Sequence, residues 1–272
     1  MNKNICIGTM LWGSKTNEQQ AHTIIEEALE YGVDFFDTAQ IYPTFPYTEK
    51  TYGLSERILG NFIAKNPNKL RISTKLKSPV EVRDVRNLVD ESLQRLNVER
   101  IDYLHFHWPR RDHYHFRQMW KDKPDHYWHT NPTDGNMDYF DRCSEVLNDL
   151  VDEGKIDNIC MSNETAWGVT QWAQRLPLKC IQNEYSLLHR IFELDVAEAC
   201  HHHDVKLLAW TPLAGGLLTG KYTYIDAPEY SRRTYGGLGP RDNKNVWEPI
   251  RRYKEIAEDA GMTLTQMSMA WV

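Results

Sequence analysis

The sequence predicts an α/β protein built as a (β/α)8 barrel of the TIM type, within a chain of 272 residues. Short apolar segments alternate with amphipathic segments of helical period in about seven units, and strict alternation of this kind indicates a parallel sheet. A barrel of this type fills about 250 residues as one domain, so we expect residues 1–272 to form a single domain. The rival is a doubly wound sheet, whose G-x-G-x-x-G signature is missing because Gly8-Thr9-Met10-Leu11-Trp12-Gly13 follows the first strand.

The first half of the chain shows the alternation clearly. An apolar strand over 4–7 precedes an amphipathic helix, and the T-x-x-Q spacing of Thr16 and Gln19 predicts a capping box where this helix begins. Gly32 is expected to end it. Further strands are expected over 33–37, 70–74 and 101–106, with helices over 55–65 and 82–96.

The second half continues the pattern between two long irregular segments. Strands are expected over 155–161, 179–182 and 205–210, with helices over 139–153, 166–175, 194–203 and 247–260. Thr263 and Gln266 are spaced to begin a last helix. The irregular segments are 108–137 and 211–245, and loops this long in a compact chain are usually functional.

Composition excludes several classes of partner. The formal net charge of -6 at pH 7 provides no electrostatic footprint for nucleic acid or an anionic membrane. No apolar segment is long enough to be the core of a signal peptide or to span a membrane. Five cysteines scattered along the chain make a poor disulfide framework. We therefore expect a cytoplasmic protein with reduced, buried thiols. His201, His202 and His203 are adjacent on a predicted helix and point apart, so we expect no metal site there.

Polar residues with acid/base chemistry follow consecutive predicted strands. In a TIM barrel, catalytic groups lie at the carboxyl ends of the strands and in the loops that follow. Asp37 and Tyr42 follow the second strand, Lys75 ends the third and His107 ends the fourth. An acid, a phenol, an amine and an imidazole are thus expected at one rim of the barrel.

These four residue types suit proton transfer to an oxygen. A tyrosine has a pKa near 10, but a nearby ammonium favours its phenolate, and an imidazole can orient the substrate oxygen. Lys75, held by Asp37, would be that ammonium. The set contains no obvious acyl nucleophile and no cluster with metal-ligand spacing, so the missing reactant is a hydride, which a nicotinamide supplies.

Each of the four also has a structural interpretation. Asp37 could cap a turn, Tyr42 could be a loop aromatic, Lys75 could be solvated and His107 could be a satisfied buried histidine. Their joint occurrence at the predicted strand ends favours a site over four coincidences.

A set of motifs along the chain resembles the aldo-keto reductases, especially the Tas-like bacterial branch that is related to the β-subunits of voltage-gated potassium channels. The motifs are Gly8-Thr9-Met10, Phe36-Asp37-Thr38-Ala39 with Tyr42, Thr74-Lys75, His107-Trp108-Pro109, Met161-Ser162-Asn163-Glu164, Gln182-Asn183-Glu184-Tyr185-Ser186-Leu187-Leu188, and the segment from Ala209 to Tyr222. They cover nearly the whole chain in order, and as a set they are highly specific.

The resemblance implies an NADP(H)-dependent reductase with Tyr42 as general acid/base, Lys75 and Asp37 as the pair that tunes it, and His107 as the substrate-orienting group. It implies that Ser162, Asn163 and Gln182 bind the nicotinamide carboxamide and that Trp210 stacks on the ring. The cofactor set that it implies is Thr9, Met10, Asp37, Ser162, Asn163, Gln182, Trp210, Thr211, Pro212, Leu213, Ala214, Gly215, Lys221 and Arg232. Backbone amides of 211–215, with Lys221 and Arg232, would neutralise the diphosphate.

The chain differs from the family pattern at both ends. The family usually begins with a β-hairpin, whereas this sequence begins almost at the first strand. After Val272 the family continues into an eighth strand and helix that grip the adenosine 2′-phosphate. We therefore expect a barrel that lacks its last strand-helix unit, with a gap between its seventh and first strands.

Two other functions stay open at this point. One is a non-catalytic, sensor-like barrel that binds the dinucleotide; the other is a sugar isomerase or lyase, which would need a carboxylate and histidine metal set. For the enzyme we expect a small carbonyl substrate and, in solution, a monomer or a homo-oligomer. Trp120, Tyr127 and Trp128 in the first irregular segment favour an aromatic pocket wall for a sugar or aryl aldehyde, although a solvated lid would have the same composition.

Overall fold

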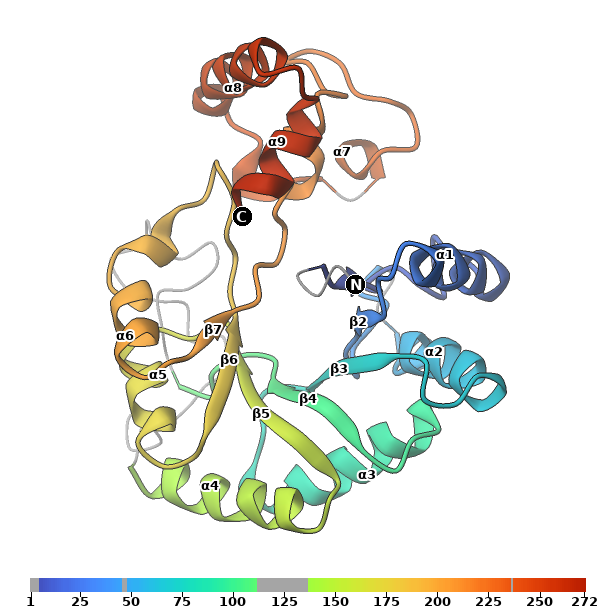
Figure 1. Cartoon of the computed structure of the whole chain (residues 1–272), viewed down its shortest axis with the longest axis vertical. Helices are drawn as coiled ribbons and strands as arrows, with labels where there is room; N and C mark the ends of the chain where they lie inside the picture. Colours follow the sequence, from blue (N-terminus) through green and yellow to red (C-terminus); the bar gives the residue numbers. More distant parts are fainter. Residues whose placement is uncertain (1–4, 46–47, 112–136, 236) are drawn as a thin grey trace. The chain divides into compact units, whose positions relative to one another are not determined.

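The computed structural model describes residues 5–45, 48–111, 137–235 and 237–272 (Figure 1). The chain divides into two compact units, Met1–Ile181 and Gln182–Val272. Among the described residues, every helix is too short or too polar to cross a membrane.

The first unit is built on a curved sheet whose strands follow the order of the chain (Figure 1). The strands are β1 (Ile7–Gly8), β2 (Phe35–Asp37), β3 (Arg71–Leu76), β4 (Ile101–Phe106), β5 (Ile156–Ser162) and β6 (Leu178–Gln182). The pairs from β1 to β5 are parallel. Their register places Lys75 opposite His105 and His105 opposite Cys160, so these side chains share one face of the sheet.

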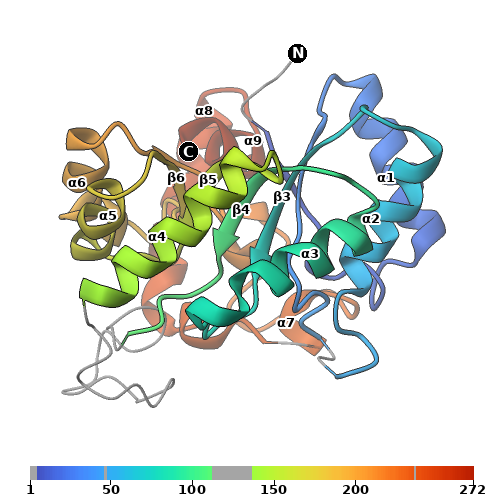
Figure 2. The ribbon, with the colours of Figure 1, turned by 90° about the horizontal axis from the view of Figure 1, so that it is seen from below.

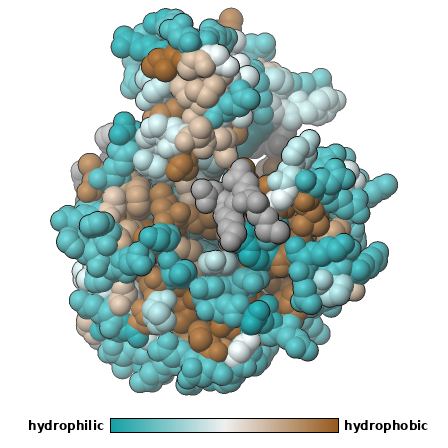
Figure 3. All heavy atoms as spheres, viewed as in Figure 1, coloured by the Kyte–Doolittle hydropathy of each residue, from teal (hydrophilic) through white to brown (hydrophobic). Residues whose placement is uncertain are grey.

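Helices lie outside this curved sheet, between the successive strands (Figures 1 and 2). They are α1 (Glu18–Glu30), α2 (Leu54–Lys65), α3 (Val85–Leu96), α4 (Met137–Asp152) and α5 (Ala166–Ala173), with a 3-10 turn at Val82–Asp84. Their apolar stripes face inward: Ile58 and Leu59 on α2, and Val89 and Leu96 on α3, are buried. In Figure 3 the helical rim is mostly hydrophilic, and hydrophobic residues gather inside it.

The first helix begins at a different capping box from the predicted one. Asn17, not Thr16, is the N-cap: its side chain accepts from the amide of Gln20, and the Gln20 side chain accepts from the amide of Asn17. Thr16 instead forms a bridge with Trp12, and its carbonyl accepts from the amide of Gly13 at 2.7 Å. The prediction was wrong by one residue because Asn is an equally good cap and Thr16 is occupied by the preceding turn.

The second unit has few regular elements and a small core of its own. Its elements are α6 (Val196–His202), β7 (Lys206–Leu207), α7 (Arg232–Tyr235), α8 (Trp247–Asp259) and α9 (Leu264–Trp271), with 3-10 turns at Ile191–Glu193, Ala214–Thr219, Gly239–Arg241 and Lys244–Val246. Leu217, Leu218, Ile250 and Leu264 are buried together in this core. The capping box of Thr263 and Gln266 is confirmed.

Seven strands are present in the described residues, as the alternation predicts, but the seventh is shorter than expected. A strand was predicted over 205–210, but only Lys206–Leu207 is a strand in the structure. Trp210 forms a single bridge with Glu184. The chain leaves extended geometry at Thr211, whose φ is 58°. The gap expected between the seventh and first strands stays a prediction.

Candidate functional site

Three of the four predicted acid/base residues stand at the carboxyl ends of consecutive strands in the first unit. Asp37 is the last residue of β2, Lys75 is the next to last of β3, and His107 directly follows β4. Tyr42 lies in the loop after β2. All four side chains are buried, and Lys75 is fully so.

An ion pair joins Lys75 to Asp37 in this buried setting. The ammonium of Lys75 donates to Oδ2 of Asp37 at 2.5 Å and to the carbonyl of Thr38 at 2.7 Å, and the hydroxyl of Ser73 donates to Oδ1 of Asp37 at 2.7 Å. Burial opposes the charge of Lys75, but Asp37 and Tyr42 outweigh it and raise the pKa of the ammonium. Lys75 is therefore a fixed positive charge at neutral pH.

Tyr42 lies against this charge. The Lys75 Nζ atom is 4.8 Å from the centre of the Tyr42 ring, and the two side chains are hydrogen-bonded. The backbone of Tyr42 is fixed on both sides, because its amide donates to Ala39 at 3.0 Å and its carbonyl accepts from Ser55 at 3.3 Å. The phenol is thus held beside an ammonium, the arrangement that stabilises a phenolate.

His107 also contacts the ring of Tyr42. The two rings meet edge to face, with centroids 5.7 Å apart and an interplanar angle of 79°. Burial, followed by the charges of Lys75 and His105, holds the pKa of His107 well below its usual range. Its Nδ1 atom has no hydrogen-bond partner among the described residues. His107 is therefore a neutral imidazole with one ring nitrogen available for a further hydrogen bond, as a group that orients a substrate oxygen requires.

Two of the remaining predicted residues of the first unit, Asn163 and Thr9, bond to the backbone of these four. Ser162 ends β5 and is followed by Asn163, whose amide donates to the carbonyl of His107 at 2.9 Å. Thr9 is buried, and both its amide and its hydroxyl donate to the carbonyl of Asp37, at 2.9 and 3.0 Å. Thr9 thus positions the backbone of Asp37. Met10 is half-buried, and its carbonyl accepts from the amide of Thr44.

The predicted nicotinamide residues of the second unit are Gln182 and Trp210. Gln182, at the end of β6, is buried. Trp210 is half-buried, its amide donates to Asn183 at 3.1 Å, and the guanidinium of Arg241 lies 5.6 Å from its ring. The indole is therefore fixed at its backbone and already contacts one cation.

The predicted diphosphate loop has an unusual backbone. Thr211, Ala214, Gly215 and Gly216 all have positive φ, and half-buried Pro212 and Leu213 lie between them. A Cβ at Gly216 would lie 3.2 Å from Cε of Lys221, and one at Gly215 would lie 4.0 Å from Cδ of Arg232. The two predicted cations thus approach the two glycines. The amide of Ala214 donates to the carbonyl of Thr211 within this turn.

The aromatic residues predicted to line a substrate pocket, Trp120, Tyr127 and Trp128, lie outside the described residues.

A second buried imidazole, His105, predicts how stability depends on pH. Burial, opposed by the charge of Asp37, lowers the pKa of His105 to about 4, whereas an unfolded histidine has a pKa of about 6.5. Because the unfolded chain takes up the proton first, stability is lost as pH falls from about 6.5 to 4, by about 3 kcal/mol for this residue. Denaturant unfolding at pH 7 and at pH 4, with a chelator present, should therefore show a smaller loss in His105→Asn than in the unchanged protein. An equal loss in both would contradict the assignment.

Sequence reasoning missed a cluster formed by His105, Cys160 and Cys180. Each lies two positions before a predicted site residue, namely His107, Ser162 and Gln182. Since side chains alternate along a strand, this spacing places them on the inner face, one layer deeper than the site. All five cysteines are free thiols, as predicted, but Cys6 is only half-buried.

Known proteins resemble this chain over nearly its whole length. The model of the aldo/keto reductase family matches residues 4–272. The chain is 32% identical to "Protein tas" of Escherichia coli (strain K12), over 98% of this chain and 81% of that protein. It is 28% identical to "Uncharacterized oxidoreductase YrpG" of Bacillus subtilis (strain 168), over 98% and 78%.

A solved structure gives the same result for the fold. The glycerol dehydrogenase AKR11B4 from Gluconobacter oxydans aligns with a TM-score of 0.72 at 25% identity, over 98% of this chain and 78% of that one. The predicted α/β barrel class and the predicted resemblance are confirmed. The chain belongs to the aldo/keto reductase family and is an oxidoreductase.

Proposed function

We propose that this oxidoreductase interconverts an aldehyde or ketone and its alcohol with NADP(H), and that Tyr42 is its general acid/base. The observation that carries the proposal is the contact of Lys75 with both Asp37 and Tyr42 in a buried setting. A barrel that only binds a dinucleotide needs neither the phenol nor a buried ammonium beside it, so this contact favours the enzyme over the sensor-like alternative.

The acid/base chemistry follows from the charges of the four side chains. In the reductive direction the phenol of Tyr42 donates its proton to the carbonyl oxygen as that oxygen becomes an alcohol. Lys75 stabilises the phenolate that is left, and Asp37 keeps Lys75 in place. Neutral His107, edge to face with Tyr42, orients the carbonyl oxygen. In the oxidative direction the same groups return the proton to Tyr42.

The chain's polar groups fit a nicotinamide dinucleotide, whose bound form supplies the hydride. Ser162, Asn163 and Gln182 provide amide and hydroxyl groups suited to a carboxamide, and Trp210 provides a ring for stacking. Gly215 and Gly216 are approached by Arg232 and Lys221, and a side chain at Gly216 would crowd Lys221. Cations beside a glycine loop suit a diphosphate.

A fluorescence titration with NADPH and with NADH tests the binding half of the proposal. Trp210→Ala should weaken NADPH binding by about 10- to 100-fold, because stacking on an aromatic ring contributes about 1–3 kcal/mol. Trp167→Ala is the matched control, since this tryptophan is exposed on α5 and should leave affinity unchanged. Equal affinity in the two variants would exclude Trp210 as the stacking residue, and tighter binding of NADH would exclude the NADP(H) preference.

A cytoplasmic location, a small carbonyl substrate and a single barrel domain belong to the same proposal. Size-exclusion chromatography with light scattering would decide between a monomer and a homo-oligomer.

A further inference from the structure

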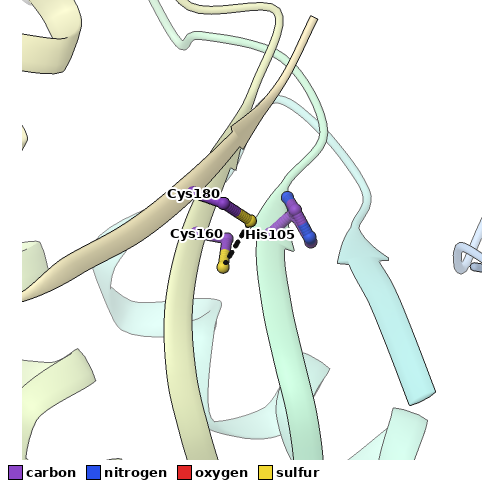
Figure 4. Close-up of side chains that lie close together, drawn as sticks. All are labelled: His105, Cys160 and Cys180. Carbon is purple, nitrogen blue, oxygen red and sulfur yellow. Dashed lines mark hydrogen bonds between the residues drawn. The ribbon is translucent and has the colours of Figure 1, made fainter. Parts of the chain in front are cut away.

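His105, Cys160 and Cys180 come from three neighbouring strands and meet inside the first unit (Figure 4). One donor atom from each lies within 4.8 Å of the other two. The two sulfur atoms are 3.2 Å apart. All three side chains are buried, so the cluster offers one imidazole and two thiols to an ion, and a water would take the fourth position of a tetrahedral site.

We propose that these three side chains bind one zinc ion. Zinc is bound by imidazole nitrogen and by cysteine sulfur, whereas calcium and magnesium require oxygen ligands. The sequence predicted no metal site, because the only candidate ligands considered there were the adjacent histidines 201–203, whose side chains point apart.

The hydrogen bonding of His105 favours a ligand role. Its Nδ1 atom lies 3.2 Å from the carbonyl of Met161, which can only accept, so Nδ1 carries the proton. Nε2 is then a lone pair, and it has no hydrogen-bond partner among the described residues. A histidine that donates one ring N–H to a backbone carbonyl and offers the other nitrogen is the usual arrangement at zinc sites.

Charge balance favours a divalent ion. Burial raises the pKa of the Cys160 thiol well above its ordinary value, because a lone thiolate is unfavourable there. When zinc binds, each thiol loses its proton to solvent and two Zn–S bonds form, so two protons are released and the complex is neutral. A monovalent copper ion with two thiolates would leave a buried negative charge, which is costly.

The distances require only small side-chain movements. Zn–S bonds of about 2.3 Å and Zn–N bonds of about 2.0 Å in a tetrahedron place the sulfurs about 3.8 Å apart and each sulfur about 3.5 Å from the nitrogen. The observed sulfur separation is 3.2 Å, and one ring nitrogen of His105 lies within 4.8 Å of both sulfur atoms. Because the cluster is buried, the ion should enter as the sheet forms, and metal should be present during refolding.

Cobalt is a suitable probe, since its thiolate complexes absorb in the near ultraviolet and its tetrahedral complexes in the visible. The full chain, unfolded in denaturant with a reductant and refolded with Co²⁺, should gain both bands at about one ion per chain, and Zn²⁺ should remove them. Cys160→Ser, Cys180→Ser and His105→Asn should each lose the thiolate band or reduce it. Cys143→Ser is the matched control, because this buried cysteine lies on α4, and it should keep both bands.

A measurement on the unchanged protein guards against variants that fail to fold. Zinc binding during refolding at neutral pH should release about two protons per ion, measured by pH-stat titration against refolding without metal. Release of no protons, or binding without a thiolate band, would overturn the proposal and assign the metal to surface histidines. Refolded protein without bound cobalt would overturn it too.

Discussion

Replacement of Tyr42 by phenylalanine should lower kcat by about 10²- to 10⁴-fold, the usual contribution of a positioned general acid. Phenylalanine keeps the ring that packs against His107 and Lys75, and it removes only the hydroxyl that would give the proton. Steady-state oxidation of NADPH with a panel of sugar and aryl aldehydes measures the effect. NADPH affinity should stay the same, because the proposal gives the hydroxyl no part in binding.

Tyr52→Phe is the matched control for this experiment. Tyr52 lies in the same loop, and its ring makes cation–π contacts with Lys77 and Arg95. Removal of the Tyr52 hydroxyl should leave kcat unchanged. A Tyr42→Phe protein with normal kcat would remove Tyr42 from the chemistry while leaving the binding proposal intact. Intact binding without turnover of any aldehyde by the unchanged protein would favour the sensor-like alternative.

The candidate site could be predicted because a general rule of barrels fixes where chemistry lies. Asp37, Lys75 and His107 were found by counting strands and reading the residue at each carboxyl end. The contact between Lys75 and Asp37 was predicted from opposite charge at neighbouring strand ends, and the structure places these atoms 2.5 Å apart. The positions of the strand ends were therefore enough to predict these three residues of the site.

Short polar residues could not be given their roles in the same way. Ser73 donates to Asp37, and Ser55 donates to the carbonyl of Thr9 at 3.0 Å, across 46 positions of the chain. Serine and threonine satisfy many kinds of local bond, and their partners depend on the final packing. Trp210 shows the same limit at the backbone: its apolar neighbours predicted a strand, but the positive φ of Thr211 depends on the turn that follows.

The burial of a carboxylate on α2 could not be predicted either. Glu56 falls in the predicted helix 55–65, where a carboxylate is normally solvated. In the structure its side chain is fully buried: it accepts from the hydroxyl of Thr74 at 2.6 Å and from Nε of Arg95 at 2.6 Å. Arg95 lies on α3 and Thr74 on β3, and α3 packs against both α2 and β3, which brings these partners together.

The buried ion pair of Glu56 and Arg95 supports the loop that carries Tyr42. A Cβ on Gly53, the residue before α2, would lie 2.5 Å from Cδ of Arg95, so the arginine packs directly on that turn. The amide of Gly53 in turn donates to the carbonyl of Gln40 at 2.8 Å, two residues before Tyr42. The ion pair thus supports both the fold and the position of the phenol.

Glu56→Ala should therefore lower the free energy of unfolding by about 3–5 kcal/mol, since it removes the buried carboxylate and leaves the buried Arg95 charge with only the half-exposed carboxylate of Glu91. Denaturant titration followed by circular dichroism measures this loss. Glu91→Ala is the matched control, because Glu91 pairs with the same guanidinium at 3.1 Å but is half exposed, and such pairs contribute less than about 1 kcal/mol.

A double replacement separates a buried ion pair from simple loss of packing. In Glu56→Met with Arg95→Met both charges are gone and most of the volume is kept, so the protein should recover much of the stability that Glu56→Ala loses. If the double variant is instead less stable than Glu56→Ala, the geometry of the pair and its bond to Thr74 would matter more than the loss of the buried carboxylate beside Arg95. Such an outcome would also predict a displaced Tyr42 loop, visible as a kcat deficit in the folded double variant.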